Sequence, residues 1–415
     1  MSEVQALDAP APSIPANGNG KPPAPPKVII NTAALVTAMI SVKGASDLVF
    51  SPGRPPQVEL HGRLTPVKID GLPILLPEHT AQIANDLVAG DEHTQGILKR
   101  SGSCDLSYSL PQRARFRVNV FRQRNTYAIV MRVIPFNIPG FEQLNLPPEL
   151  KKIASLKNGI VLVTGPTGSG KSSTLAAVVD LINSTRADHI VTIEDPIEFL
   201  HGHKMATVHQ RELHSDTDSF ASALRAALRQ APKVILVGEM RDQETIEIAM
   251  TAAETGHLVF STLHTIDASK TVERIIGVFP AGDQQAVRTR LAASFRYFVS
   301  QRLLPRRDGN GRVAIIEILK STMRTREYIE KGEGDGKSLV DAMRDGDMDG
   351  MQEFDSQLER AVNLGVITKD DALHFATNAG NLNLRLSEVD DSEIQPAGPE
   401  VLYLDSLQEA VEVDR

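Results

Sequence analysis

The residues with the most specific chemistry in this chain form the segment Gly165-Pro-Thr-Gly-Ser-Gly-Lys-Ser172. Glycines at this spacing let backbone N–H groups turn toward a polyphosphate, while the Lys171 ammonium reaches the β and γ phosphates. The Ser172 hydroxyl is placed to bind Mg²⁺. We therefore predict that the chain binds a nucleoside triphosphate. The residues predicted to hold it are Gly165, Pro166, Thr167, Gly168, Ser169, Gly170, Lys171, Ser172 and Ser173.

The elements on either side of this loop support the prediction. Gly159–Val163 is an apolar run typical of a buried strand, and a helix is expected from Lys171 to Ile182. The positive end of that helix dipole favours a bound phosphate. A glycine-rich turn without a ligand is the alternative, but it does not account for the order of strand, loop and helix.

Three further apolar runs end in carboxylates or histidine. They are His189–Ile193 with Glu194, Asp195 and Glu198, Lys233–Val237 with Glu239, and His257–Ser261 with His264. Short apolar runs that alternate with helical stretches indicate an α/β fold with a parallel sheet. Because ligands bind beyond the carboxyl ends of such strands, we expect all the polar clusters to meet at the phosphate loop.

The ordered set of motifs resembles the type II/type IV secretion ATPase family, and within it the pilus retraction ATPases of the PilT and PilU type. The resemblance rests on Gly165–Ser172, Thr192–Glu198, Leu236–Asp242 and Thr255–His264, which are similar to the Walker A, aspartate, Walker B and histidine boxes of the family. It extends from about residue 31 to 386. Asn381-Leu-Asn-Leu-Arg385 is closer to PilU, and Thr322–Tyr328 departs from a signature that PilT carries.

The resemblance implies a PAS-like N-terminal domain followed by a RecA-like P-loop NTPase core with C-terminal helices. We place the PAS-like domain at 29–136, where a helical stretch at Thr32–Val42 precedes strand-like runs at Gln57–Leu60, Arg115–Val120 and Tyr127–Val133. The ATPase domain is expected at 137–386. From about residue 282 its pattern is helical, interrupted by a strand at 312–319. The Pro/Ala-rich segment 1–28 is predicted to be disordered, and 387–415 to be a solvated acidic tail.

Two glutamates are the candidates for orienting the attacking water. The chain departs from the general P-loop pattern, because Gly238 stands where an acid usually ends the Walker B strand. The family shares this departure, which implies Glu198 as general base and Glu239 holding Mg²⁺ through water; the reverse assignment stays open. Glu194 and Asp195 are expected to orient these groups. His264 is expected to sense the γ phosphate, the alternative being a structural histidine.

A run of arginines gives the N-terminal domain a basic face. Arg113, Arg115 and Arg117 share one side of a predicted strand, since side chains alternate along strands. A solvated surface and a nucleic-acid contact are two interpretations. The resemblance implies a third, in which Arg115 or Arg117 reaches the γ phosphate between domains or subunits.

Composition limits the class of protein. The net charge of −8 argues against nucleic-acid binding, and the single cysteine, Cys104, excludes an internal disulfide or a zinc ribbon. No run is long enough to span a membrane, so membrane association is expected only through partners. His201, His203, His209 and His214 could suggest a metal site, but we expect a polar surface loop.

The resemblance implies a cytoplasmic hexamer that hydrolyses ATP with Mg²⁺ and powers type IV pilus retraction at the inner membrane. Its implied partners are a pilus platform protein and a paralogous pilus ATPase. Three alternatives stay open: a pilus extension or type II secretion ATPase, a nucleic-acid motor with the same core, and a regulatory module that binds ATP without hydrolysis.

Overall fold

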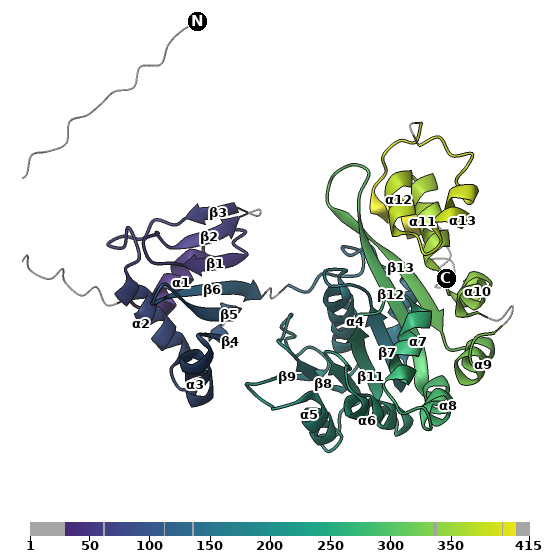
Figure 1. Ribbon diagram of the computed structural model, residues 1–415, viewed down its shortest axis with the longest axis horizontal. Coiled ribbons are helices and arrows are strands. Elements are labelled where there is room, and N and C mark those ends of the chain that lie inside the picture. Colours follow the sequence, from purple (N-terminus) through teal and green to yellow (C-terminus); the bar gives the residue numbers. More distant parts are fainter. Residues whose placement is uncertain are drawn as a thin grey trace, which may run out of the picture.

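The computed structural model describes residues 30–60, 63–111, 113–134, 137–334, 338–391 and 393–403. The segment 1–28, expected to be disordered, lies outside these ranges. Two sheets organise the described residues (Figure 1), one of six strands and one of seven. We call residues 30–134 the N-terminal unit, 137–320 the core and 323–403 the C-terminal helical unit.

The N-terminal unit is an antiparallel sheet with helices against one face, in the strand order β3-β2-β1-β6-β5-β4. Its strands are β1 (Asp47–Phe50), β2 (Gln57–Leu60), β3 (Arg63–Pro66), β4 (Ser103–Leu110), β5 (Ala114–Gln123) and β6 (Thr126–Ile134). Its helices are α1 (Thr32–Ile40), α2 (Pro77–Val88) and α3 (Glu92–Ser101). The predicted helix and the three strands predicted here are confirmed.

Strand β5 divides its side chains between two environments. Phe116, Val118 and Val120 are fully buried in the cluster that also contains α1 and α2 residues. Arg115 is half-buried and Arg117 exposed on the opposite face. The alternation expected for a strand with one covered face therefore turns the arginines away from the helices.

The core sheet has the order β13-β12-β7-β11-β10-β8-β9 and is parallel from β12 to β9. Its strands are β7 (Gly159–Thr164), β8 (His189–Glu194), β9 (Thr207–Glu212), β10 (Val234–Val237), β11 (Leu258–Leu263), β12 (Phe295–Pro305) and β13 (Arg312–Lys320). The five strands predicted from apolar runs, β7, β8, β10, β11 and β13, are confirmed. Strand β13 alone in this sheet pairs antiparallel, with β12.

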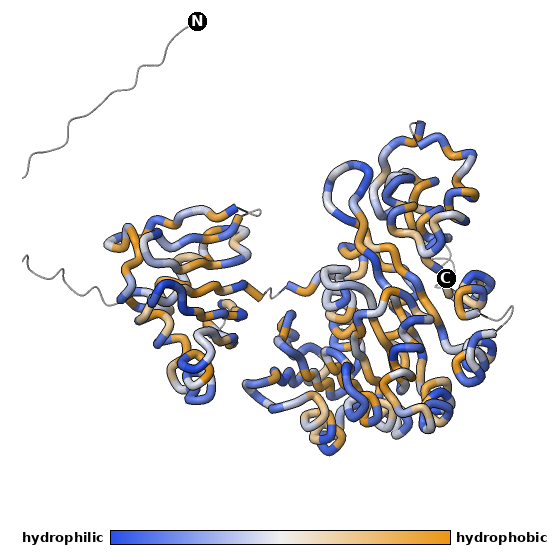
Figure 2. The backbone as a smooth tube through the Cα atoms, in the orientation of Figure 1, coloured by the Kyte–Doolittle hydropathy of each residue, from blue (hydrophilic) through white to orange (hydrophobic). Residues whose placement is uncertain are grey.

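Helices cover both faces of the core sheet. Val161 and Val163 of β7 pack toward α4 (Lys171–Thr185) and the 3₁₀ helix η1 (Pro148–Ser155), while Ile160 and Leu162 face the other side. That other side is covered by α5 (Phe220–Ala227), α6 (Gln243–Glu254), α7 (Ala268–Gly277) and α8 (Gln284–Ser294). The central strands are the most hydrophobic part of the core (Figure 2), as expected for parallel strands buried on two faces.

One stretch of the core differs from expectation. Residues 295–305 were expected to continue a helical region, but they form β12, which lies between β7 and β13. Phe295, Tyr297, Phe298 and Val299 are buried there. Aromatic and β-branched side chains suit a central strand, and the polar residues in its middle conceal that pattern in the sequence.

The C-terminal helical unit packs in two places: its first two helices lie against the core helices α7 and α8, and its later helices pack on the outer ends of β12 and β13 (Figure 1). It comprises α9 (Met323–Lys331), α10 (Leu339–Arg344), η2 (Asp347–Asp349), α11 (Phe354–Asn363), α12 (Lys369–Phe375), α13 (Ala379–Arg385) and η3 (Pro399–Tyr403).

The segment expected to be a solvated acidic tail is described up to Tyr403; its residues Glu388, Asp390, Glu393 and Glu400 are exposed, but the segment also packs against this unit. Leu402 and Tyr403 are buried against this unit, and Arg307 forms an ion pair with Asp391. Apolar residues spaced among the acidic ones give the segment enough surface to bury.

Candidate active site

The phosphate loop connects β7 to α4 and lies directly against β12. Gly165 has φ +143°, and a Cβ atom there would approach the carbonyl oxygen of Gln301 to 2.3 Å. Gly170 has φ +90°, and its Cβ would lie 2.9 Å from the Gln301 amide nitrogen. Glycine is therefore required at both positions by backbone conformation and by space.

Two side chains of the loop are prepared for an anion. Lys171 is 8% exposed, and its ammonium donates hydrogen bonds to the carbonyl oxygens of Gly165 (2.8 Å) and Pro166 (3.0 Å). Burial lowers the pKa of Lys171, while the charges of Glu198 and Glu239 oppose that shift. The Ser169 hydroxyl is buried and has no hydrogen-bond partner in the described part of the chain.

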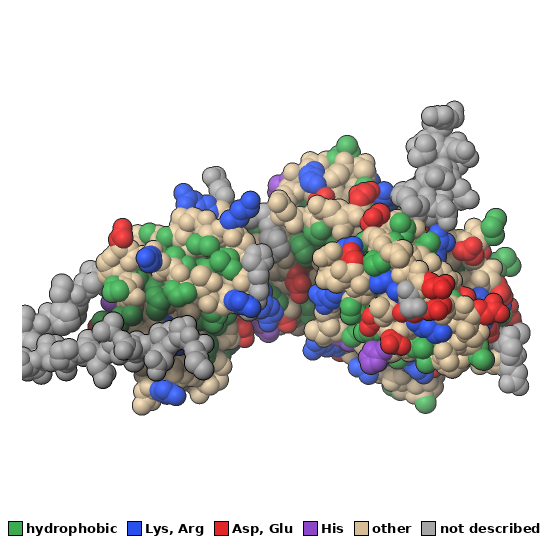
Figure 3. All heavy atoms as spheres, turned by 90° about the horizontal axis from the view of Figure 1, so that it is seen from above, with side chains coloured by type: hydrophobic (Ala, Val, Ile, Leu, Met, Phe, Trp, Pro, Cys, Tyr) green, Lys and Arg blue, Asp and Glu red, His purple; other side chains and the backbone are tan. Residues whose placement is uncertain are grey.

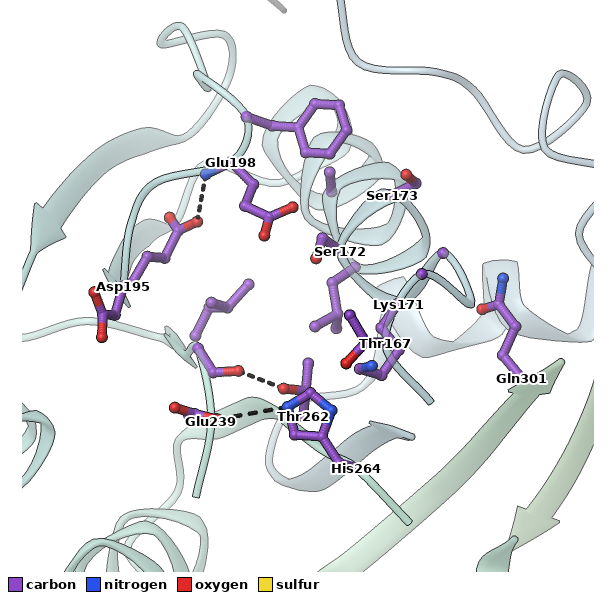
Figure 4. Close-up of a pocket in the computed structure, with 18 of the residues that line it drawn as sticks. Thr167, Lys171, Ser172, Ser173, Asp195, Glu198, Glu239, Thr262, His264 and Gln301 are labelled. Atoms are coloured by element: carbon purple, nitrogen blue, oxygen red, sulfur yellow. Dashed lines mark hydrogen bonds and ion pairs between the residues drawn. The ribbon is translucent and has the colours of Figure 1, made fainter. Parts of the chain in front are cut away.

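The polar clusters at the ends of β7, β8, β10 and β11 meet around one cavity of about 600 Å³ (Figure 4). The sequence predicted that these polar clusters would meet, because the carboxyl ends of parallel strands share one edge of the sheet. Of the predicted nucleotide-binding residues, its wall contains Thr167, Gly168, Gly170, Lys171, Ser172 and Ser173. Gly165 and Pro166 contact the lysine instead, and Ser169 is buried in the loop.

The two candidate catalytic glutamates lie on different sides of this cavity. Glu198 follows β8 and projects toward the start of α4, whereas Glu239 follows β10 beside His264 (Figure 4). A Glu239 carboxylate oxygen lies 2.5 Å from Arg241 Nε and 3.7 Å from His264 Nε2. Partial burial and the charge of Lys171 lower the pKa of His264. This favours a neutral imidazole at pH 7.

A side chain at position 238 would be crowded by the end of β8. A Cβ atom on Gly238 would lie 3.3 Å from the Ile193 carbonyl oxygen and 3.4 Å from Glu194 Cα. The Gly238 carbonyl also accepts a hydrogen bond of 2.6 Å from the Thr262 hydroxyl. A carboxylate at the end of β10 therefore comes from Glu239.

Glu194 holds the segment that carries Glu198. Its carboxylate accepts hydrogen bonds from the Thr192 hydroxyl (2.6 Å), the Gln210 amide (3.1 Å) and the backbone N–H of Glu198 (3.4 Å). Desolvation raises the pKa of Glu194. Asp195 is exposed and lines the cavity. Glu194 and Asp195 were both expected to orient the catalytic groups. Among the described contacts, only Glu194 forms a hydrogen bond to the neighbouring backbone.

Neither candidate arginine lines the cavity of its own chain. Arg115 forms an ion pair of 3.0 Å with Glu212 of the core, and Arg117 is exposed on the same face of β5. The prediction that one of them reaches the γ phosphate between subunits is not tested by a single chain.

The cavity also contains polar residues that the sequence did not predict as part of the site, among them Gln301, Arg241 and His201. Gln301 comes from β12, so the error in that strand concealed it; its amide oxygen accepts a hydrogen bond of 2.9 Å from Thr174. Arg241 lies within the Walker B segment, two residues after Glu239. His201 was expected on a surface loop, but it lines the cavity, and burial lowers its pKa to about 4.

Two of the remaining histidines contact each other. His189 and His209 are joined by a 2.9 Å contact between ring nitrogens. Over the described ranges, no group of three or more His, Cys, Asp or Glu side chains is arranged to hold a metal by itself. No helix in the same ranges combines the length and the hydrophobicity needed to cross a bilayer.

The sequence motifs of the type II/IV secretion system protein family match residues 102–362. A twitching motility protein of Neisseria gonorrhoeae is 46% identical over 330 residues, which cover 79% of this chain and 86% of the relative. The type IV pilus retraction ATPase PilT of Pseudomonas aeruginosa is 43% identical over 335 residues, with coverage of 81% and 95%.

A crystal structure of the pilus retraction motor PilT with bound ADP has a TM-score of 0.74 to this chain at 40% identity. The match covers 84% of this chain and 98% of that structure. The predicted α/β fold class, an N-terminal domain with an ATPase core, is therefore confirmed. The chain belongs to the type II/IV secretion system protein family, among its PilT-like members.

Proposed function

We propose that this protein is a Mg²⁺-dependent ATPase that works as a hexameric ring and powers type IV pilus retraction. The observation that carries the proposal is the position of Glu198 and Glu239 around one cavity with Lys171 and Ser172. PilT of P. aeruginosa, similar over most of both chains, is named as a pilus retraction ATPase. ADP is bound in the PilT crystal structure.

The phosphate loop fits ATP on several grounds. Its glycines leave no side chain between the loop and β12, and the Ser169 hydroxyl has an unused hydrogen bond. Lys171 donates to carbonyl oxygens of its own loop. On binding, the β and γ phosphates replace those neutral acceptors with charged ones, which makes the hydrogen bonds of the lysine stronger.

The same cavity fits Mg²⁺ bound together with ATP. Mg²⁺ keeps several waters and takes few protein ligands beside substrate phosphates. The ion would be held by the Ser172 hydroxyl and, through water, by the Glu239 carboxylate. The described residues contain no group of three or more His, Cys, Asp or Glu side chains that could bind a metal without the nucleotide. When bound, the ion neutralises charge on the β and γ phosphates.

Glu198 is assigned as the general base. It is exposed at the cavity, opposite the start of α4, and is free to accept a proton from a water at the γ phosphate. Glu239 is engaged by Arg241 and lies near His264, which suits a fixed metal-orienting group better than a base. His264 would contact the γ phosphate as a neutral donor.

In the proposed ring, an arginine from the N-terminal unit of a neighbouring subunit completes the site, since Arg115 and Arg117 do not line the cavity of their own chain. We assign Arg117 as the residue that reaches a neighbouring subunit, since it is exposed on β5. Mixing Arg117→Ala chains with Lys171→Ala chains should restore part of the ATPase activity, because one intact arginine then meets one intact phosphate loop. Failure of every mixing ratio would contradict a trans arginine.

The enzymatic proposal is tested by measuring phosphate release from ATP together with the mass of the assembly by light scattering. Hydrolysis should require Mg²⁺ and should rise as hexamers form. A protein that binds ATP, assembles and yet never hydrolyses it would be a regulatory module instead. Binding of single-stranded DNA in a filter assay would favour the nucleic-acid motor.

The direction of the motor is tested in cells. Acting at the cytoplasmic side of the inner membrane through a platform protein, beside a paralogous pilus ATPase, a retraction motor removes pilin subunits. Deletion of the gene should leave pili present or more abundant while twitching is lost. Loss of all surface pili would favour the extension ATPase.

A further inference from the structure

Glu212 connects the N-terminal unit to the segment that carries Glu198. It ends β9, directly opposite Glu194 at the end of β8 in the parallel register. Its side chain is enclosed, with 4% of the residue exposed. Basic and acidic side chains gather where the N-terminal unit meets the core (Figure 3).

The Glu212 carboxylate receives hydrogen bonds from both sides of this junction. From the N-terminal unit, the Ser107 hydroxyl donates to Oε1, and Arg115 Nη2 donates to Oε2 at 3.0 Å. From the core, the backbone N–H of Ile197 donates to the same Oε2 at 3.1 Å. One oxygen atom therefore joins the guanidinium of one unit to the main chain of the other.

Ile197 immediately precedes Glu198, so this contact acts on the backbone of the candidate base. Ile197 is buried, while the Glu198 side chain is exposed to the cavity. The neighbouring attachment, from the Glu198 N–H to Glu194, is longer at 3.4 Å. Both N–H groups donate to a glutamate carboxyl group, so the shorter Ile197 contact is the firmer of the two.

We propose that Glu212 is a positioning residue that makes the placement of Glu198 depend on docking of the N-terminal unit. This rests on the proposed function, because Glu198 is assigned there as the base. With Ser107 and Arg115 in contact, the carboxylate is fixed and holds the Ile197 N–H. When the N-terminal unit moves away, Glu212 loses its cation, and a buried charge without that partner draws in water or changes rotamer.

The proposal separates two arginines that the sequence left equivalent. Arg115 acts through Glu212 in its own chain. Arg117 is exposed on the same face and opposite Ser107 in the β4–β5 register, and it is assigned to the neighbouring subunit. Mixing with Lys171→Ala chains should therefore rescue Arg117→Ala but leave Arg115→Ala without rescue.

The kinetic test uses full-length Glu212→Gln, which keeps the shape of the side chain and removes its charge. The expected result is a kcat lower by roughly 10- to 100-fold with an unchanged KM for ATP, because the base is displaced while the nucleotide site is intact. Ser107→Ala is a milder variant that keeps the ion pair and should give a smaller loss of kcat. Asp47→Asn is the matched control. It removes a buried carboxylate that pairs with Arg132 at 2.9 Å within the N-terminal unit, and its kcat should stay unchanged.

A second readout does not depend on hydrolysis. Amide hydrogen exchange in a peptide covering 195–199, measured without nucleotide, should be faster in Glu212→Gln and Arg115→Ala than in the wild type or Asp47→Asn. The double variant should exchange no faster than either single one, since both remove the same connection. If the wild type hydrolyses no ATP, the proposed function fails while this exchange experiment still tests the coupling.

The coupling is overturned by either of two results. Unchanged exchange and unchanged kcat in Glu212→Gln would leave the residue as an ordinary contact between units. Rescue of Arg115→Ala by Lys171→Ala chains would place this arginine at the neighbouring site, outside the path through Glu212.

Discussion

The guanidinium carbon of Arg302 lies 3.7 Å from the centre of the Phe354 ring. Arg302 belongs to β12, and Phe354 is the first residue of α11, so the contact joins the core to the C-terminal helical unit. The same guanidinium donates hydrogen bonds to the Phe375 carbonyl and, at 3.1 Å, to the Thr377 hydroxyl. It also reaches the Ile266 carbonyl at 3.4 Å, two residues beyond His264.

Replacing this side chain should weaken the attachment of the helices. Arg302→Lys cannot stack on the ring and satisfy the three acceptors at once, because an ammonium lacks the planar fork of donors. We expect the free energy of unfolding in urea to fall by about 2–3 kcal/mol. Arg274→Lys, on an exposed position of α7, is the control and should change it little. Equal stability of both variants would show that the stacking contributes nothing.

Lys171→Ala should abolish productive nucleotide binding. The buried ammonium of Lys171 lies in the phosphate loop, and its loss leaves Glu198 and Glu239 to repel the phosphates. Titration with a fluorescent ATP analogue should show an affinity at least about 100-fold weaker, corresponding to about 3 kcal/mol. Lys270→Ala, an exposed lysine on α7, should bind as the wild type does. Normal affinity without Lys171 would exclude it as the phosphate clamp.

Substitution of the two glutamates should separate base from metal holder. Glu198→Gln should retain ATP and Mg²⁺ affinity and lose turnover by roughly two to three orders of magnitude. Glu239→Gln should lose turnover on the same scale and also require more Mg²⁺, because its carboxylate orients the metal-bound water. Single-turnover rates measured across a Mg²⁺ titration distinguish the two. A raised Mg²⁺ requirement in Glu198→Gln alone would reverse the assignment.

The close approach of the phosphate loop to β12 makes a prediction about glycine. Gly165→Ala should lower the free energy of unfolding by about 3–5 kcal/mol, because its Cβ meets the Gln301 carbonyl at 2.3 Å and its φ is +143°. Gly168→Ala is the matched control. It has φ +80° but open space around the new methyl, so only backbone strain of about 1–2 kcal/mol is expected. Chemical denaturation without nucleotide measures both; equal losses would contradict the steric argument.

A buried carboxyl in the core predicts a pH dependence of stability. Burial raises the pKa of Glu317 from 4.5 to about 8, while the Ala268 N–H donates to it at 2.7 Å and Arg302 and Asp267 lie nearby. Between those pKa values the folded protein keeps a proton that the unfolded chain has released. The free energy of unfolding therefore falls as pH rises, by up to about 1.4 kcal/mol per pH unit.

Glu317→Gln should remove this contribution, since the amide does not ionise. Its stability relative to the wild type should be constant below pH 4.5, rise toward pH 8 and level off above. Urea unfolding of both proteins across that range measures the difference. Glu247→Gln on the exposed face of α6 is the control, and its difference should stay flat. A flat difference for Glu317→Gln as well would mean that the carboxyl titrates normally.

The sequence by itself determined the candidate nucleotide site. Gly165–Ser172 defines a strand, loop and helix through local backbone geometry, and the polar ends of β8, β10 and β11 follow from parallel strands sharing one edge of a sheet. Each of these features is encoded within a few neighbouring residues, or by a topology that a parallel sheet dictates. For that reason Glu198, Glu239 and His264 could be placed around the cavity before the fold was known.

Three other features of the protein were decided by the tertiary structure alone. The strand β12 has polar residues in buried positions, where Ser300 bonds to Thr164 of β7 and Gln301 bonds to Thr174 of α4. The segment up to Tyr403 reads as an acidic tail until its scattered apolar side chains meet the helices. Glu212 and Arg115 are 97 residues apart. Contacts across such separations depend on how whole units dock, and no local pattern of residue types encodes that.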